Sequence, residues 1–312
     1  MKIKKNYLFL FLVILLFSGC TSSAKNKNKA FINIPDINNY DAIFIGENHT
    51  HSENFHVQIR LMKHYYAQGV RDFAFEAGYA DTLFFQHYID TGDEECLEFL
   101  FRANMGTFGC SREAFDFYRE LYKWNSGLGE KIKFHGFDVE QKPVTGIAAI
   151  WFFVLRNYEQ YKNIPLATSQ DRLNFIQNYN YNTHRYSELD AKDKYLLERI
   201  MMGIGQAVQV YLNNYYNEAL RAQYMTDNFS EILSENKDRK IFAIMGSWHA
   251  ASTGFVRNTP SMANALKDEI RIASVSIGQT GYKEIWPYII PINTKRKVTP
   301  FTSAYKGNWP YN

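Results

Sequence analysis

The chain has 312 residues, of which 46% are hydrophobic and 16% aromatic, which is enough apolar material for one large core. Its 35 basic and 32 acidic residues leave a net charge of only +3 and are interspersed along the chain. These numbers do not indicate a nucleic-acid partner, because proteins of that class concentrate their basic residues in patches.

The N-terminal segment has the features of an export signal. A basic start is followed by an unbroken apolar run, Tyr7–Phe17, and then by LFSGC, which ends at Cys20. The run is shorter than the roughly 20 residues that span a bilayer, and it is typical of a signal peptide. We predict a signal peptide over residues 1–19, acylation of Cys20 and a polar, lipid-anchored tether over residues 20–36. The alternative is an ordinary secreted protein in which Cys20 occurs by chance.

Acylation of Cys20 predicts a location in the cell envelope. In an organism with two membranes we expect the outer one, because Thr21 replaces the aspartate that commonly retains lipoproteins at the inner membrane. Export also permits a disulfide between Cys96 and Cys110. Two free, partly buried thiols are the other interpretation.

Apolar runs alternating with helical patterns predict an α/β fold over residues 37–312, with a mainly parallel central sheet flanked by helices. The predicted strands are Asp41–Gly46, Arg71–Glu76, Lys131–Phe137, Lys240–Gly246 and Arg271–Ile277. The predicted helices are His56–Gly69, Ser111–Asn125 with Ser111 as N-cap, and long helices from about Leu189 to Asn236. Strand signals are lacking from about 144 to 236, which predicts a long helical insertion there.

Carboxylates and histidines stand at the ends of four of these strands. They are Glu47 and His49, then Glu76, then His135 and Asp138, and finally His249. Ligands of open parallel sheets bind outside the carboxyl ends of the strands. We therefore expect these side chains to converge on one cleft.

The residue types in this cleft suit the activation of water. Glu47 and His49 are two residues apart and share a face if the strand continues. A carboxylate beside an imidazole fixes its tautomer and raises its basicity, so His49 could take a proton from water. Glu76 could share that proton, and His249 could donate to an oxygen that becomes negative. In a metal-assisted version of this chemistry, His49, His249 and Glu47 could bind a divalent metal, zinc or manganese.

Several of these residues have a plainer interpretation. A glutamate at a strand end, such as Glu76, is often a loop hydrogen-bond acceptor. His135 could be a structural histidine, and Asp138 could cap the next helix. The prediction therefore rests on the occurrence of such residues at four strand ends.

Short motifs recur along the chain in a recognisable order. They are IFIGENHTHSENF, FAFEAGYAD, HYIDTGDEECLEFLF, FYRELYKWN, IKFHGFDVEQ, RAQYMTDNF and IFAIMGSWHA. This series, from about Tyr40 to Ala251, resembles the erythromycin esterase-like family. The wider group includes haem-binding lipoproteins of iron uptake and Tiki-type metalloproteases, which share the Glu-x-His spacing found here.

The resemblance implies a site at Glu47, His49, Glu76 and His249, with Asp138, His135 and Arg221 as supporting candidates. It implies an exported hydrolase in which histidine-activated water attacks an ester or related carbonyl of a small-molecule substrate. The alternative is a surface lipoprotein that binds haem or another ligand without catalysis.

Overall fold

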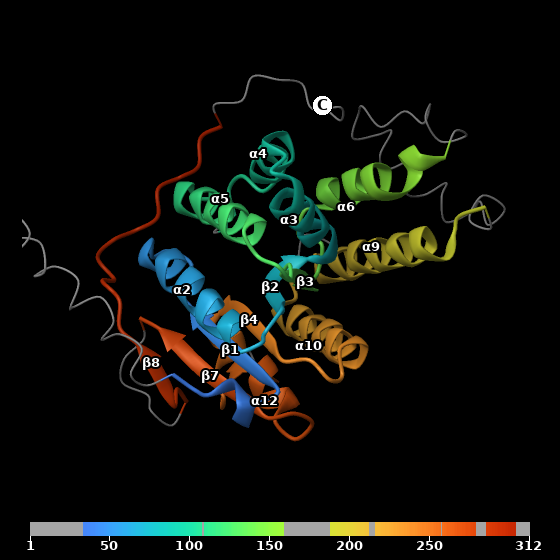
Figure 1. The fold of residues 1–312 in the computed structure, drawn as a ribbon. Coiled ribbons are helices and arrows are strands. Elements are labelled where there is room, and N and C mark those ends of the chain that lie inside the picture. Colours follow the sequence, from blue (N-terminus) through green and yellow to red (C-terminus); the bar gives the residue numbers. More distant parts are fainter. Residues whose placement is uncertain are drawn as a thin grey trace, which may run out of the picture. The chain divides into compact units, whose positions relative to one another are not determined.

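Figure 1 shows the computed structural model of the chain, which describes residues 34–107, 109–158, 188–211, 216–256, 258–278 and 285–303. Pro35–Asn312 form one compact unit, separate from Met1–Ile34. The predicted signal peptide, Cys20 and most of the predicted tether lie outside the described residues. Among the helices of the described ranges, none has the length and apolar character needed to cross a membrane.

Six parallel strands form the central sheet, in the order β3-β2-β4-β1-β7-β8. Their bounds are Ala42–Glu47 for β1, Asp72–Gly78 for β2, Lys133–Asp138 for β3, Ile241–Gly246 for β4, Ile272–Ile277 for β7 and Tyr288–Ile290 for β8. The first five are the predicted strands, so the predicted α/β class is confirmed. The three-residue β8 was not predicted, because it is too short to show a pattern. The same holds for the hairpin of β5, Phe255–Val256, and β6, Thr259–Pro260.

Helices cover the sheet and extend beyond its β3 edge. The longer ones are α2 Glu53–Ala67, α3 Tyr79–Thr91, α4 Glu94–Ala103, α5 Arg112–Ser126, α6 Pro143–Ala149, α9 Ala191–Val210 and α10 Glu218–Glu235. The shorter ones are η2 Ile37–Asn39, η3 Ile150–Val154, η4 Leu155–Asn157, α11 Ser247–Ala250 and α12 Met262–Leu266. α5 begins as predicted, because the Oγ of Ser111 accepts the backbone N–H of Ala114 at 3.1 Å.

Alternation along the strands assigns neighbouring residues to opposite faces of the sheet. On one face, the ring of Phe44 in β1 contacts Phe229 of α10, with 5.0 Å between the centroids. On the other face, Phe242 of β4 contacts Tyr65 of α2 at 5.3 Å. Every residue of β1 is buried, as expected for a central strand that is covered on both sides.

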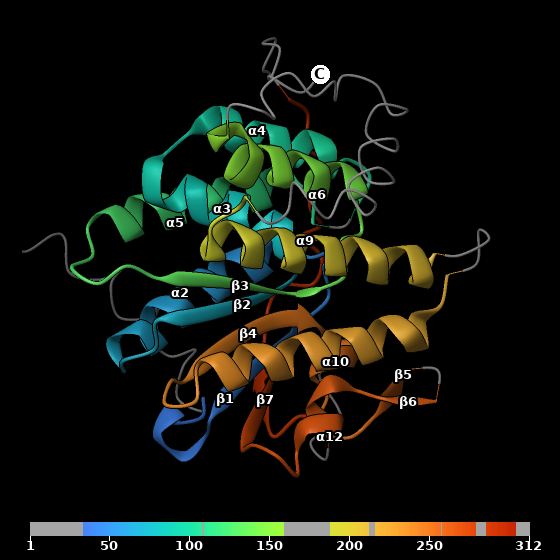
Figure 2. The same ribbon diagram turned by 90° about the vertical axis from the view of Figure 1, so that its right-hand side faces the viewer.

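A second core lies among α3, α4, α6 and α9, which Figure 2 shows together on the side of β3. Within the range of the predicted insertion, the described residues form helices and their connections, without a strand. α6 and α9 belong to this second core, whereas α10 packs on the sheet. The insertion and its bounds stay a prediction.

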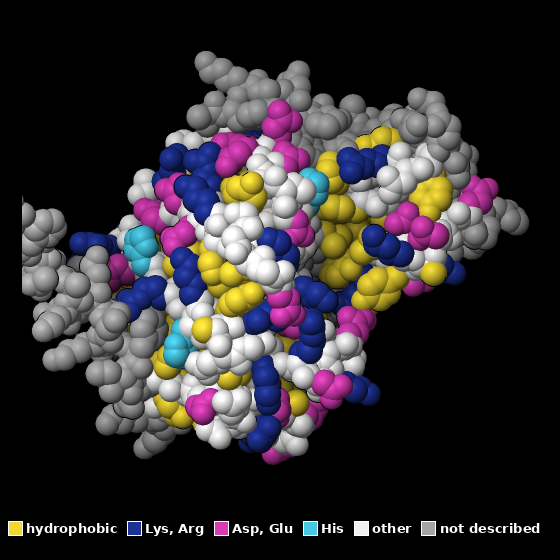
Figure 3. Space-filling model, in the orientation of Figure 1, with side chains coloured by type: hydrophobic (Ala, Val, Ile, Leu, Met, Phe, Trp, Pro, Cys, Tyr) yellow, Lys and Arg dark blue, Asp and Glu magenta, His cyan; other side chains and the backbone are white. Residues whose placement is uncertain are grey.

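Cys96 and Cys110 are both free thiols, so the second interpretation of these cysteines is correct. Cys96 is buried in the second core. The Sγ atom of Cys110 donates to the carbonyl oxygen of Phe101 at 3.0 Å. On the face seen in Figure 3, basic and acidic side chains are interspersed, in agreement with the small net charge.

Candidate active site

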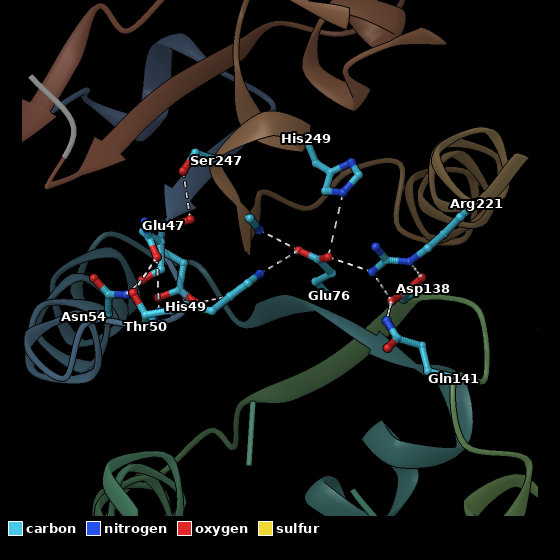
Figure 4. A network of polar contacts seen from close by, with 12 residues as sticks. Glu47, His49, Thr50, Asn54, Glu76, Asp138, Gln141, Arg221, Ser247 and His249 are labelled. Carbon is cyan, nitrogen blue, oxygen red and sulfur yellow. Dashed lines mark hydrogen bonds and ion pairs between the residues drawn. The ribbon is translucent and has the colours of Figure 1, made fainter. Parts of the chain in front are cut away.

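A cavity of about 660 Å³ opens at the carboxyl ends of β1, β2, β3 and β4. Six of the seven residues predicted for catalysis or support line it, and Figure 4 shows how they face one another. They are Glu47, His49, Glu76, Asp138, Arg221 and His249. The four strand ends thus converge as expected for a parallel sheet.

Glu47 and His49 form a hydrogen-bonded pair at the end of β1. The Nδ1 atom of His49 lies 2.9 Å from Oε1 of Glu47. The other oxygen, Oε2, accepts from Nε2 of Gln58 in α2 at 2.5 Å. Glu47 is on the α2 face of β1 because it is three residues from Phe44, which faces α10 on the opposite side. The carboxylate therefore holds Nδ1 of the imidazole and leaves Nε2 for other partners.

Glu76, at the end of β2, connects the other charged groups. Its Oε1 accepts from Nη2 of Arg221 at 2.7 Å, and its Oε2 accepts from the backbone N–H of Gly246 at 2.5 Å. Nε2 of His49 is 3.9 Å from Oε2, and Nε2 of His249 is 3.8 Å from Oε1. One carboxylate thus lies between two histidines and an arginine.

Arg221 is held in place by Asp138 of β3. Its Nε and Nη2 donate to Oδ1 and Oδ2 of Asp138 at 2.9 and 2.5 Å, the bidentate geometry that guanidinium and carboxylate favour. Gln141 donates to the same carboxylate at 2.5 Å. The resemblance implied a supporting role for Arg221, and the structure brings this residue of α10 to the site. Removing one partner of such a buried ion pair lowers the free energy of unfolding by about 3–5 kcal/mol.

Gly246 permits the close approach of these side chains. A Cβ atom at this position would lie 3.1 Å from Nε2 of His49 and 3.3 Å from Oε2 of Glu76. Both distances are shorter than ordinary van der Waals contact. Gly246 is followed by α11, which presents Ser247 and His249. The Oγ of Ser247 donates to the carbonyl oxygen of Glu47 at 2.8 Å, and this bond joins the ends of β1 and β4.

The pKa values of His49 and Glu76 are both strongly perturbed. Burial opposes the charged form of His49, but the hydrogen bond to Glu47 and the charges of Glu76 and Glu47 outweigh it and raise its pKa to about 9. Burial likewise opposes ionisation of Glu76. The charges of His249, Arg221 and His49, with the N–H of Gly246, outweigh that effect and hold its pKa well below the usual range. At neutral pH the site therefore contains an imidazolium beside an ionised carboxylate.

The structure does not bring His135 to the cavity. Its Nε2 lies 2.8 Å from Oδ1 of Asp72, at the start of β2, and Asp72 also binds Arg239. The plainer interpretation, a structural histidine, describes this arrangement.

The predicted metal ligands do not form one coordinating group. Glu47 contacts His49, whereas His249 contacts Glu76. Within the described ranges, no three side chains of His, Cys, Asp or Glu are arranged to hold a metal ion. The zinc or manganese set of His49, His249 and Glu47 therefore has no support in this geometry.

Several residues around the site were not predicted from the sequence. Gln58 donates a hydrogen bond to Glu47, and Gln141 donates one to Asp138. Gly246 leaves space for the side chains of His49 and Glu76. A polar residue on a buried helix face is the signal that could have identified Gln58. Asp81 and a group of aromatic side chains also line the cavity; several of them stand in the short motifs quoted above, but their position beside the site was not predicted.

No protein-family model and no curated protein matches the chain. Several solved structures match the chain. A Bacillus cereus protein aligns with a TM-score of 0.54 at 15% identity, covering 77% of this chain and 66% of that protein. A succinoglycan biosynthesis protein has a TM-score of 0.53 at 20% identity and the same coverage. An erythromycin esterase mutant in its open conformation has a TM-score of 0.50 at 12% identity, covering 77% of this chain and 70% of the esterase.

The chain spans just under two thirds of the length of the first two of these proteins. Similarity at such low identity is a similarity of fold, and function is carried by sites that are built on folds. The resemblance found in the sequence is thereby supported at the level of the fold: the chain shares the α/β fold of the erythromycin esterase.

Proposed function

We propose that the cavity is the active site of a hydrolase that acts on an ester or related carbonyl of a small molecule. The observation that carries the proposal is the pairing of His49 with Glu47 at the cavity wall, with Nε2 directed towards Glu76. One of the structural neighbours is named an erythromycin esterase, and that name supports the hydrolysis of an ester.

His49 is the proposed proton acceptor. Glu47 fixes Nδ1, so Nε2 is the atom that would remove a proton from water as the water attacks the carbonyl carbon. The imidazolium formed in this step is stabilised by Glu47 and Glu76. His249 is the proposed donor to the developing oxyanion, because it also lines the cavity. Arg221 is better placed to hold Glu76 than to bind substrate, since Asp138 and Glu76 already occupy Nε and Nη2.

The raised pKa of His49 predicts a characteristic pH dependence. Only the neutral imidazole accepts a proton, so hydrolysis should increase with pH up to about 9, the pKa of His49.

The test is hydrolysis of p-nitrophenyl esters and simple lactones by the purified protein. His49→Gln should lose about 10²–10⁴-fold in rate. His56→Gln, an exposed histidine on α2, should behave like the wild type. Assays with zinc, manganese and a chelator would detect any metal requirement. No turnover on the whole panel, or full activity in His49→Gln, would rule the proposal out.

Ligand binding without turnover is the second candidate. Both oxygens of Glu76 already accept hydrogen bonds, and His49 is protonated at neutral pH. Such a site is as well suited to holding an anionic or polar group as to reacting with it. This candidate would be favoured if an ester or lactone of the same panel binds to the protein and its rate of hydrolysis does not increase.

We further propose that acylated Cys20 anchors the protein in the cell envelope, through its lipid and without a spanning helix. Membrane fractionation of cells that carry wild type or Cys20→Ser tests this. The wild type should be in the membrane fraction and the variant should not. A wild-type protein found wholly in the soluble fraction would contradict the proposal.

A further inference from the structure

Aromatic rings form part of the wall of the cavity. These aromatic side chains come from β2, α3, α4 and α5, and we call them the aromatic chamber: Phe75, Phe85, Phe101, Phe117 and Tyr118. The ring of Phe85 stacks on Tyr118, with 3.9 Å between centroids and an interplanar angle of 4°.

The chamber is supported from behind by further rings. Phe75 packs against Phe134 of β3 at 4.8 Å, and Phe101 packs against Phe301 at 5.1 Å. Four of the five chamber residues expose less than a tenth of their surface. A pre-formed apolar recess of this kind suits a ring or another compact apolar group of a ligand.

Asp81 places a carboxylate beside the chamber. It lies in the first turn of α3, four residues before Phe85, so the two side chains share one face of the helix. Asp81 also lines the cavity and is only 7% exposed. The effect of its charge reaches Tyr118: burial, and then the charge of Asp81, raise the pKa of that phenol.

The partners of Asp81 are neutral. Nδ2 of Asn104 donates to its Oδ1 at 3.4 Å, which is a long hydrogen bond, and the neutral hydroxyl of Thr145 also acts on the carboxyl. The charge that acts on it most is that of another carboxylate, Asp138. A buried carboxylate usually has a cation as partner, and within the described residues Asp81 has no ion pair with Lys, Arg or His. A ligand can supply the missing positive charge from the cavity.

We propose that Asp81 and the aromatic chamber bind a ligand that carries a protonated amine on an aromatic or other apolar ring. The amine would donate to the Asp81 carboxylate, and the faces of the surrounding rings would also attract the cation. The ring would occupy the space between Phe85, Phe101 and Phe117. That such a ligand is also a substrate rests on the proposed hydrolase function, but its binding does not.

The experiment compares two probes of equal size, 2-phenylethylamine and 2-phenylethanol, by calorimetric titration of the full chain at neutral pH. The amine should bind at least about tenfold more tightly than the alcohol, as expected for a hydrogen bond to a buried charge. Asp81→Asn should reduce the amine affinity to that of the alcohol. Asp116→Asn, which removes an exposed carboxylate from α5, should leave the preference unchanged.

A second variant separates the ring contacts from the charge. Phe85→Leu keeps Asp81 and should weaken both probes by a similar factor while the preference for the amine remains. Equal affinity of the wild type for both probes, no binding of either, or a preference that persists in a folded Asp81→Asn protein would overturn the proposal.

The outcome is independent of catalysis. His49→Gln should reduce any ester hydrolysis by about 10²–10⁴-fold and keep the preference for the amine. Amine binding without hydrolysis of any ester would refute the proposed hydrolase and support this inference. Ester hydrolysis without a preference for the amine would support the hydrolase and refute this inference.

Discussion

At the scale of single residues, the unusual feature is a histidine that is protonated at neutral pH. The side chain of His49 is 35% exposed, yet burial is still the largest single influence on its pKa, and it acts to lower that pKa. Its environment is set by the carboxylates of Glu47 and Glu76. A general base works best with a pKa near the working pH, and the site therefore favours alkaline conditions or a ligand that changes the charge balance.

We expect Glu47→Gln to lower the pKa of His49 from about 9 towards its ordinary value. The amide keeps a hydrogen-bond acceptor but removes a negative charge that stabilises the imidazolium. Titration of the His49 ring protons by NMR measures this directly. Glu95→Gln, on the exposed side of α4, is the matched control. An unchanged His49 titration in Glu47→Gln would contradict the assignment of the shift to Glu47.

At the scale of elements, the cavity depends on where helices begin. α5 brings Phe117 and Tyr118 to the aromatic chamber, and its first turn is held by Ser111. The hydroxyl of Ser111 is buried and accepts an N–H that would otherwise lack a partner.

Ser111→Ala should lower the free energy of unfolding by about 1 kcal/mol, the usual cost of losing an N-cap. Ser126→Ala, at the exposed C-terminal end of α5, serves as the control, because its hydroxyl only donates to the carbonyl oxygen of Lys123. Urea denaturation of both variants gives the comparison. Equal stability of the two variants would mean that the cap does not stabilise α5.

At the scale of the whole molecule, the pKa shifts set the pH dependence of stability. His49 has a folded-state pKa of about 9, above its unfolded value of about 6.5. A raised histidine pKa contributes stability that is fully present below the unfolded pKa and is lost as the pH rises through the folded one. Glu76 has the opposite sign, since its lowered pKa contributes stability above the unfolded pKa.

The difference in unfolding free energy between wild type and His49→Gln should therefore decrease as the pH rises from 7 to 9.5. Denaturant titrations at several pH values measure this difference. His64→Gln provides the comparison, because burial lowers the pKa of His64 and its charge is absent over this range. A difference for His49→Gln that stays constant with pH would show that its interaction with the carboxylates does not stabilise the fold.

Much of this architecture could be predicted from local patterns. The five long strands were predicted because a strand buried on both faces is a continuous apolar run. Ser111 was identifiable as a cap from its position before a helical pattern. Glu47, His49, Glu76 and His249 stand at the ends of those runs, and a parallel sheet brings its strand ends to one edge.

Residues whose role depends on distant partners could not be assigned in this way. His135 and Asp138 stand three residues apart on β3, yet His135 pairs with Asp72 while Asp138 binds Arg221 at the cavity. The predicted metal set does not form a coordinating group among the described residues, because Glu47 binds His49 whereas His249 contacts Glu76.

The sequence by itself therefore determined the α/β class, the long strands and the strand-end residues, because hydrophobic periodicity and chain direction are local properties. Only the tertiary structure decided that Arg221 bridges Glu76 and Asp138, that Gly246 leaves room for His49, and that Asp81 lies beside an aromatic chamber. Those contacts join helices and strands that are far apart in the chain, and their geometry is set by packing between layers, which no local pattern encodes.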